Sequence, residues 1–190
     1  MVYNCIMRII TGKYKGRKLV APDGDTRPTL DRAKETLFNM LGDLNDKIVL
    51  DLFAGSGQIA AECLSRGAAR AVMCDNSREA AKAITENFAK LGEKPELFKC
   101  EYFACLRSLV GTKFDLVYVD PPYKSDVYSD VLTKVVSLGL LNDEGEIVCE
   151  HAVENKIPQN ICGLVAYKFR KVGTVMFTFF RKANVENEQN

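Results

Sequence analysis

The spacing of hydrophobic and polar positions changes near residue 46. Beyond this point, short runs of apolar and β-branched residues alternate with longer stretches whose apolar residues recur at helical spacing. Runs of the first kind predict strands, and stretches of the second kind predict helices. The alternation indicates crossover connections, hence an α/β fold with a mostly parallel sheet and helices on both faces. The predicted strands span residues 47–51, 71–75, 96–100, 114–120 and 146–149, and the predicted helices span residues 57–66, 78–91, 103–110 and 128–138.

The last part of the chain departs from this alternation. Residues 164–171 and 175–181 are two strand-like runs separated only by a turn that contains Gly173. This turn is too short for a helical crossover, so the two strands should be antiparallel. The whole pattern therefore predicts a Rossmann-like, seven-stranded, mostly parallel sheet with an antiparallel C-terminal strand.

The segment before residue 46 has a pattern of its own. Residues 7–22 contain two short apolar runs bounded by Gly12 and Gly16, which predicts a β-hairpin, and residues 29–41 carry an apolar stripe typical of an amphipathic helix. We therefore expect three parts: a basic hairpin arm and helix over residues 1–45 packed on a body over residues 46–183, and a polar tail over residues 184–190.

Composition narrows the class of protein. The 190 residues are 47% hydrophobic and 27% charged, which excludes a disordered chain or a coiled-coil rod and fits one packed body. No stretch has the apolar length of a membrane span, and the first residues lack the apolar centre of a secretory signal, so we expect a cytoplasmic protein without a membrane partner. The cysteines are odd in number without a C-x-x-C pair, and there is one histidine, so we expect reduced thiols and no metal.

The formal net charge of +1 conceals an uneven distribution. Residues 1–40 carry eight basic and four acidic side chains, residues 41–150 carry twelve and eighteen, and residues 151–190 carry six and three. A basic front suits a polyanion such as nucleic acid, although a solvated surface explains this feature equally well. The basic residues of the predicted hairpin are Arg8, Lys13, Lys15, Arg17 and Lys18.

A glycine-containing turn follows the first predicted strand of the body. Gly55 and Gly57 would let the backbone approach a ligand, and parallel sheets bind ligands at the carboxyl ends of their strands. Asp75 ends the next strand, where an acid that binds a ribose is expected. The pattern therefore favours a cofactor with a ribosyl group, and an NAD-linked oxidoreductase remains one interpretation of it.

A second motif ends the strand over residues 114–120. Asp120, Pro121, Pro122 and Tyr123 combine an acid, two residues without an N–H donor and an aromatic ring. The Asp120 carboxylate and nearby carbonyl oxygens can accept hydrogens from an exocyclic base amine, while the Tyr123 ring can stack on the base. A proline-stiffened end of a strand beside a core tyrosine is the plainer interpretation.

These motifs together resemble a known family. The run from Asp51 to Gly57 and the run from Asp120 to Tyr123 look like those of class I S-adenosylmethionine-dependent methyltransferases that modify exocyclic amines. The front of the chain closely resembles that of the RsmD family, bacterial 16S ribosomal RNA guanine-N2 methyltransferases, in the segments 7–12, 16–19, 27–32 and 35–39. The resemblance covers about residues 7–182.

The resemblance implies roles for individual residues. It implies that S-adenosylmethionine is the cofactor and that Asp75 accepts its ribose hydroxyls, while Glu101 lies near its adenine amine. Arg27 and Thr29 would approach either the methionine carboxylate or the RNA. The target base would meet Asp120, Pro121, Pro122 and Tyr123, and the methionine part would meet Asp51, Phe53, Ala54, Gly55, Ser56 and Gly57.

The implied reaction is direct methyl transfer to a guanine N2 amine of the guanine-966 type. Asp120 and the Pro121 carbonyl would accept the amine hydrogens, and no covalent intermediate is needed. The implied partner is 16S ribosomal RNA, within a partly assembled small subunit, bound by a monomer through the basic front and Arg27. A DNA or N6-adenine methyltransferase shares the Asp-Pro-Pro-Tyr motif and stays an alternative, as does an RNA-binding module without activity.

Overall fold

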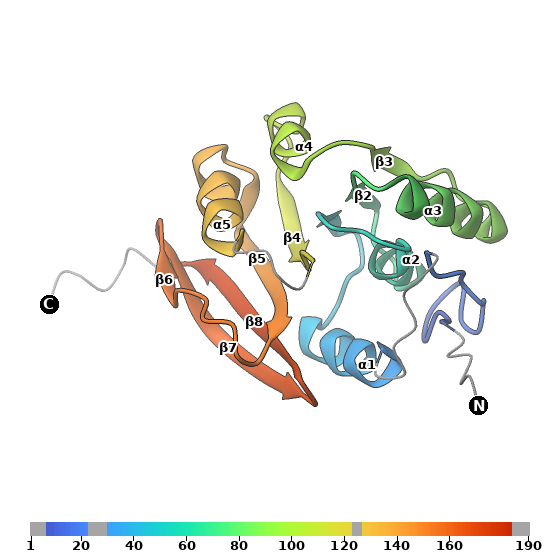
Figure 1. Ribbon diagram of the computed structural model, residues 1–190, viewed down its shortest axis with the longest axis horizontal. Coiled ribbons are helices and arrows are strands. Elements are labelled where there is room, and N and C mark those ends of the chain that lie inside the picture. The colour runs from blue at the N-terminus through green and yellow to red at the C-terminus, as the bar shows by residue number, and fades with distance from the viewer. Residues whose placement is uncertain (1–6, 23–29, 123–126, 184–190) are drawn as a thin grey trace, which may run out of the picture.

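The computed structural model describes residues 7–22, 30–122 and 127–183. In these ranges a single mixed sheet is flanked by helices (Figure 1). The helices are α1 (Leu30–Leu41), α2 (Gln58–Ser65), α3 (Arg78–Leu91), α4 (Tyr102–Ser108) and α5 (Tyr128–Ser137). The strands are β1 (Ile48–Asp51), β2 (Arg70–Cys74), β3 (Glu96–Phe98), β4 (Phe114–Val119), β5 (Leu141–Ala152), β6 (Asn160–Ile161), β7 (Leu164–Val172) and β8 (Val175–Lys182).

The strand order is β3-β2-β1-β4-β5-β8-β7-β6. The first five strands in this order are parallel, and β8 is antiparallel to both β5 and β7, which confirms the predicted class of sheet. Two differences from the prediction are the largest. An eighth strand, β6, pairs with β7 through only two residues, which is too short to leave a pattern in the sequence. In addition, β5 begins five residues before the predicted start because Leu141 already pairs with Phe114.

The strands send alternate side chains into two different cores. Leu50 of β1 and Val117 of β4 pack with apolar residues of α4 and α5. Their chain neighbours Val49 and Leu116 pack with apolar residues of α1 and α2. Because both faces of the sheet are covered, these strands are apolar on both sides, which explains their nearly continuous hydrophobic runs.

The N-terminal segment packs on α2 and α3 as a hairpin. Its strands meet in a single antiparallel bridge between Arg8 and Lys18, and Met7, Ile9 and Leu19 are buried with residues of α2 and α3. Glycine is required at Gly12, because a Cβ there would overlap the Ser65 carbonyl oxygen at 1.7 Å.

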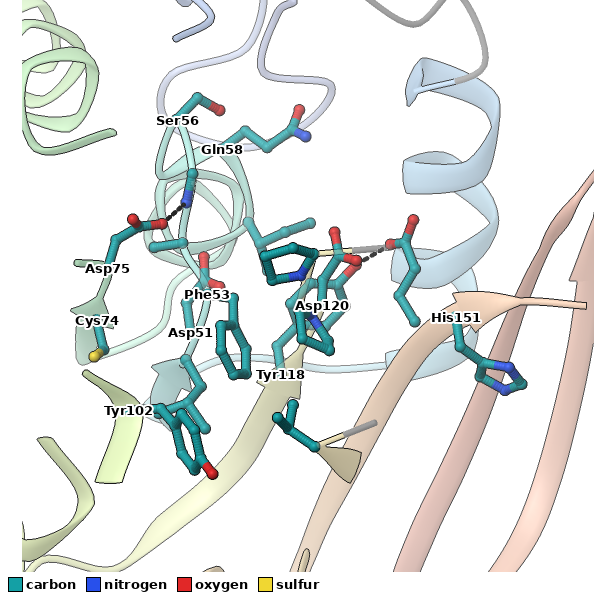
Figure 2. Close-up of a pocket in the computed structure, with 18 of the residues that line it drawn as sticks. Asp51, Phe53, Ser56, Gln58, Cys74, Asp75, Tyr102, Tyr118, Asp120 and His151 are labelled. Atoms are coloured by element: carbon teal, nitrogen blue, oxygen red, sulfur yellow. Dashed lines mark hydrogen bonds between the residues drawn. The ribbon is translucent and has the colours of Figure 1, made fainter. Parts of the chain in front are cut away.

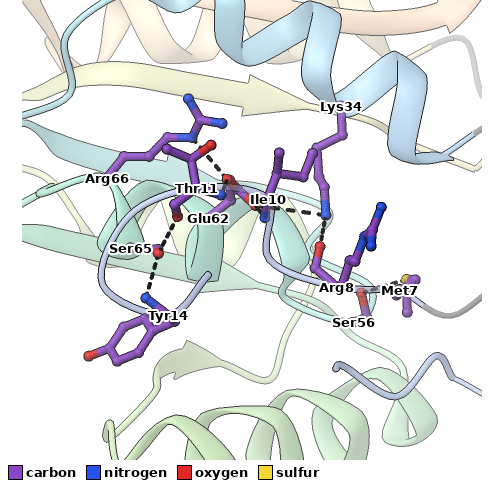
Figure 3. A network of polar contacts seen from close by, with 10 residues as sticks. All are labelled: Met7, Arg8, Ile10, Thr11, Tyr14, Lys34, Ser56, Glu62, Ser65 and Arg66. Atoms are coloured by element: carbon purple, nitrogen blue, oxygen red, sulfur yellow. Dashed lines mark hydrogen bonds and ion pairs between the residues drawn. The ribbon is translucent and has the colours of Figure 1, made fainter. Parts of the chain in front are cut away.

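A buried polar network fastens the hairpin to two helices (Figure 3). The Glu62 carboxylate of α2 accepts the Ile10 amide at 2.8 Å and the Thr11 amide at 3.0 Å. The Lys34 ammonium of α1 lies 3.8 Å from the same carboxylate and donates to the Arg8 carbonyl. Glu62 and Lys34 are both buried, so the charges of α1 and α2 neutralise each other underneath the hairpin.

Within the described residues, no helix is long and apolar enough to cross a membrane. Six cysteines in these ranges are free thiols, and Cys5 lies outside the described residues.

Candidate active site

A cavity of about 650 Å³ opens at the carboxyl ends of the parallel strands (Figure 2). Its walls come from segments far apart in the sequence: the glycine turn after β1, the ends of β2, β4 and β5, helix α1, and the base of the N-terminal hairpin. A parallel sheet concentrates ligand binding at this edge, and the volume lies within the usual range for small-molecule sites. The cavity is therefore the candidate active site.

The glycine turn after β1 forms one wall, and its two glycines have different functions. Gly55 has φ +54° and lines the cavity, where an added Cβ would meet open space. Gly57 has φ +73° and is not among the lining residues. A Cβ at Gly57 would lie 3.1 Å from Ile84 Cγ1 and 3.2 Å from Met73 Sδ and Phe88 Cε2, so this glycine allows α2 to pack closely on β2 and α3.

Asp75 connects this turn to the end of β2. Its Oδ2 accepts the Gly55 amide at 2.8 Å, as Figure 2 shows, and its Oδ1 accepts the Ser77 amide at 2.9 Å. Each carboxylate oxygen has a second lone pair, so Asp75 can hold the turn and still accept from a ligand in the cavity. Glu101 lines the same wall one strand further along, and its Oε1 accepts from Asn76 Nδ2 at 2.5 Å.

Asp51 ends β1 at the floor of the cavity. It is almost fully buried, and burial is the main cause that raises the pKa of its carboxyl to about 7, with the charges of Asp75 and Glu150 adding to the effect. Among the described residues, the buried oxygens Asp51 Oδ2 and Gln58 Oε1 have no hydrogen-bond partner in the protein, and both residues line the cavity. Two orphaned acceptors in one wall fit a ligand that brings N–H or O–H donors.

A pair of mutually tilted aromatic rings forms an apolar part of the wall. Phe53 and Tyr102 have ring centroids 5.7 Å apart at an interplanar angle of 44°, and both line the cavity. The Tyr102 hydroxyl donates to Asp130 of α5, which turns the polar end of this ring away from Phe53. The apolar faces that remain suit a planar heterocycle.

The opposite wall comes from β4 and β5. Asp120, Pro121 and Pro122 follow directly after β4 and line the cavity, with Asp120 exposed and Pro121 buried. Tyr123, the fourth residue of the predicted motif, lies outside the described residues. Tyr118 of β4 is buried below Asp120 and donates from its hydroxyl to the Glu150 carboxylate of β5.

The basic residues of the hairpin are exposed. Lys13 is paired with Glu93 at 3.2 Å, while Met7, Ala21 and Pro22 of the same segment line the cavity. The structure thus brings the hairpin to the rim of the site, with its cations facing solvent. Arg27 and Thr29 lie outside the described residues.

Sequence reasoning missed several residues that line the cavity. They are Gln58, Asn76, Tyr102, Tyr118, Glu150 and His151. Glu150 was detectable, because it lies at the carboxyl end of a predicted strand, as Asp120 does. His151 has a lowered pKa because its ring is buried, and its Nε2 contacts Thr178 Oγ1 at 2.8 Å within β8. No group of three potential metal ligands occurs among the residues that the structure describes.

Comparisons with known proteins agree with the fold and identify the family. The model of the family described as Conserved hypothetical protein 95 matches residues 7–181. Ribosomal RNA small subunit methyltransferase D of Escherichia coli strain K12 is 35% identical over 174 residues, which cover 85% of this chain and 88% of that protein. The Bacillus subtilis protein YlbH, described as a candidate rRNA methyltransferase, is 34% identical over 182 residues, covering 93% of this chain and 99% of that protein.

A solved structure extends the agreement to three dimensions. The Escherichia coli protein yhhF, described as a candidate methyltransferase, superposes with a TM-score of 0.81 at 33% identity and covers 94% of this chain and 99% of its own. The family match begins at the N-terminal hairpin and ends within β8, so it includes every segment that lines the cavity. The chain belongs to this family, the RsmD family, as the motifs at its front and around its site predicted.

Proposed function

We propose that the protein transfers a methyl group from S-adenosylmethionine to the exocyclic N2 amine of a guanine in 16S ribosomal RNA. The observation that carries this proposal is a single cavity that joins two half-sites: the glycine turn with Asp75 on one side, and Asp120 with Pro121 on the other. The name of the Escherichia coli relative, a small subunit ribosomal RNA methyltransferase, supports the choice of RNA as substrate.

The first half-site fits the proposed cofactor. Asp75 and Glu101 offer carboxylate acceptors for ribose hydroxyls and an adenine amine, and the Phe53 and Tyr102 rings offer apolar faces for the adenine. The orphaned oxygens of Asp51 and Gln58 suit the amino group of the methionine part. When bound, the sulfonium group of the cofactor supplies an activated methyl, so the protein needs mainly to orient the acceptor nitrogen.

The second half-site suits the acceptor base. Asp120 is held at the end of a rigid strand, and Pro121 and Pro122 contribute no N–H donors beside it. We assign to the Asp120 carboxylate and the Pro121 carbonyl the acceptance of the amine hydrogens. This directs the nitrogen lone pair toward the methyl group and stabilises the positive charge that develops on nitrogen. After transfer, Asp120 or water takes the proton.

The exposed cations of the hairpin would bind the phosphates of the RNA. They are Arg8, Lys13, Lys15, Arg17 and Lys18, and Arg27 is assigned the same role.

We further propose that the substrate is 16S ribosomal RNA in a partly assembled small subunit. The enzyme acts on it as a monomer, in the cytoplasm, where bacterial ribosomal RNA occurs.

The function is tested by incubating the purified protein with S-adenosylmethionine and partly assembled small subunits that carry unmodified 16S ribosomal RNA, followed by mass mapping of the RNA product. We expect one N2-methylguanine. Asp120→Ala should lower kcat at least about a hundredfold, because the positioned acceptor contributes to the transition state rather than to cofactor binding. Calorimetry with S-adenosylhomocysteine should give the same Kd for the variant and for the parent.

Two results would contradict the proposal. Methylation of adenine in DNA or RNA, with none of guanine, would favour the N6-adenine alternative. Near-normal turnover by Asp120→Ala would remove Asp120 from the reaction.

A further inference from the structure

A second carboxylate stands beside Asp120 in the same wall of the cavity. Strands β4 and β5 are parallel and in register, with Tyr118 opposite Val148 and Val119 opposite Cys149. Continuing this register by one residue sets Asp120 beside Glu150. Side chains alternate between the faces of a sheet, so Tyr118, Asp120 and Glu150 share the face that α1 covers, and all three line the cavity.

Glu150 is held in place through both its carboxylate and its backbone. The Tyr118 hydroxyl donates to Glu150 Oε2, and the Tyr128 hydroxyl donates to the Glu150 carbonyl oxygen at 2.9 Å. Burial, together with the charges of Glu150 and Asp120, raises the pKa of the Tyr118 hydroxyl well above its usual value, so this hydroxyl stays a donor. A carboxylate accepts along about four lone-pair directions, so a group fixed in this way can still accept from a ligand.

Two neighbouring carboxylates match one edge of guanine and not the corresponding edge of adenine. Guanine carries its exocyclic N2 amine next to a protonated N1, so two adjacent donors face outward. Adenine carries its N6 amine next to an unprotonated N1, whose lone pair would face a carboxylate. Enzymes that act on a base read this edge through hydrogen bonds, and a buried acceptor without a donor is costly.

We propose that Glu150 accepts the N1–H of the target guanine while Asp120 accepts the N2 amine, so that Glu150 selects guanine over adenine. This assignment rests on the proposed function and adds the residue that chooses the base. The two carboxylates have different functions. Asp120 faces the reacting nitrogen, and Glu150 sets the orientation of the guanine ring. Tyr118 is a positioning residue, because it acts through Glu150.

The test separates the N1–H from the amine. 2-Aminopurine keeps the exocyclic amine of guanine but has an unprotonated N1. Unmodified 16S ribosomal RNA is prepared with either guanine or 2-aminopurine at the methylated position, by ligation of a synthetic oligonucleotide. Each RNA is reconstituted into partly assembled small subunits, and kcat/KM is measured for both substrates. The wild-type protein should prefer guanine at least about tenfold, because 2-aminopurine leaves a carboxylate facing a lone pair.

Glu150→Gln should reduce the preference for guanine over 2-aminopurine, measured as the ratio of the two kcat/KM values, to within about threefold. The glutamine amide offers both an acceptor for N1–H and a donor for an unprotonated N1. Glu154→Gln is the matched control, since Glu154 is exposed and does not line the cavity, and it should keep the wild-type ratio. Tyr118→Phe, which frees Glu150 from its tether, should lower kcat/KM for guanine more than for 2-aminopurine.

The outcomes distinguish this inference from the function on which it rests. Equal kcat/KM of the wild-type protein for the two RNAs would overturn the role of Glu150 without any variant being needed. An unchanged ratio in Glu150→Gln, with S-adenosylhomocysteine bound as tightly as by the parent, would overturn it as well. If the wild-type protein methylates no guanine at all, the proposed function fails, and the role of Glu150 fails with it.

Discussion

At the scale of single residues, Gly55 and Gly57 look equivalent in the sequence but differ in the structure. Both have positive φ, so alanine at either position incurs a backbone penalty of about 1 kcal/mol. Only Gly57 faces packed side chains. We expect Gly57→Ala to lose about 3 kcal/mol of unfolding free energy and Gly55→Ala about 1 kcal/mol, measured by urea denaturation, because overpacking adds to the backbone penalty at Gly57 alone.

The order of the two glycine variants should be reversed for ligand affinity, with Gly55→Ala affected more than Gly57→Ala. The Gly55 methyl would project into the cavity, so Gly55→Ala should weaken S-adenosylhomocysteine binding in calorimetry although its fold is the more stable of the two. If both variants lose the same unfolding free energy and the same affinity for S-adenosylhomocysteine, the assignment of close packing to Gly57 and of ligand approach to Gly55 is wrong.

At the scale of elements, the hairpin, α1 and α2 are joined through the Glu62 carboxylate. Glu62→Gln keeps the shape but removes the charge that Lys34 faces. Its amide nitrogen replaces one of the two carboxylate oxygens, so an N–H then faces either the Ile10 or the Thr11 donor. Removing one member of a buried ion pair costs about 3 kcal/mol or more. We expect that loss in urea denaturation, together with faster hydrogen exchange at the amides of Ile10 and Thr11.

The exposed ion pair of the same hairpin is the control for this prediction. Lys13 meets Glu93 at the surface, where solvent screens the charges, so Lys13→Ala should leave stability nearly unchanged. Comparable losses in the two variants would show that burial of the Glu62 network has no special importance for docking the hairpin.

At the scale of the whole molecule, the N-terminal hairpin, the ends of the parallel strands and β8 all line one cavity. A ligand that binds only the folded chain stabilises it by about 2.7 kcal/mol at a hundred times its Kd. For a domain of this size, S-adenosylhomocysteine should therefore raise Tm by about 5–10 °C in a single transition. NAD should cause no shift, and a larger shift with NAD would restore the oxidoreductase interpretation of the glycine turn.

The sequence by itself determined much of the sheet and part of the site. Local spacing suffices for α3, whose ends at Arg78 and Leu91 were predicted correctly, and for the end of β1 at Asp51. Asp75 and Asp120, predicted as the last residues of their strands, directly follow β2 and β4. Acids at the ends of parallel strands must converge, since those ends share one edge of the sheet. The fold class and the cavity edge therefore follow from periodicity and chemistry along the chain.

Tertiary structure decided what depends on contacts between distant segments. The two residues of β6 form a strand only because β7 runs beside them, and the role of Gly57 depends on side chains that α3 and β2 bring against it. The neighbourhood of Asp120 and Glu150 likewise depends on the β4 and β5 register. Local periodicity carries no information on register or on close packing between elements, because both are set by which surfaces meet when the chain folds.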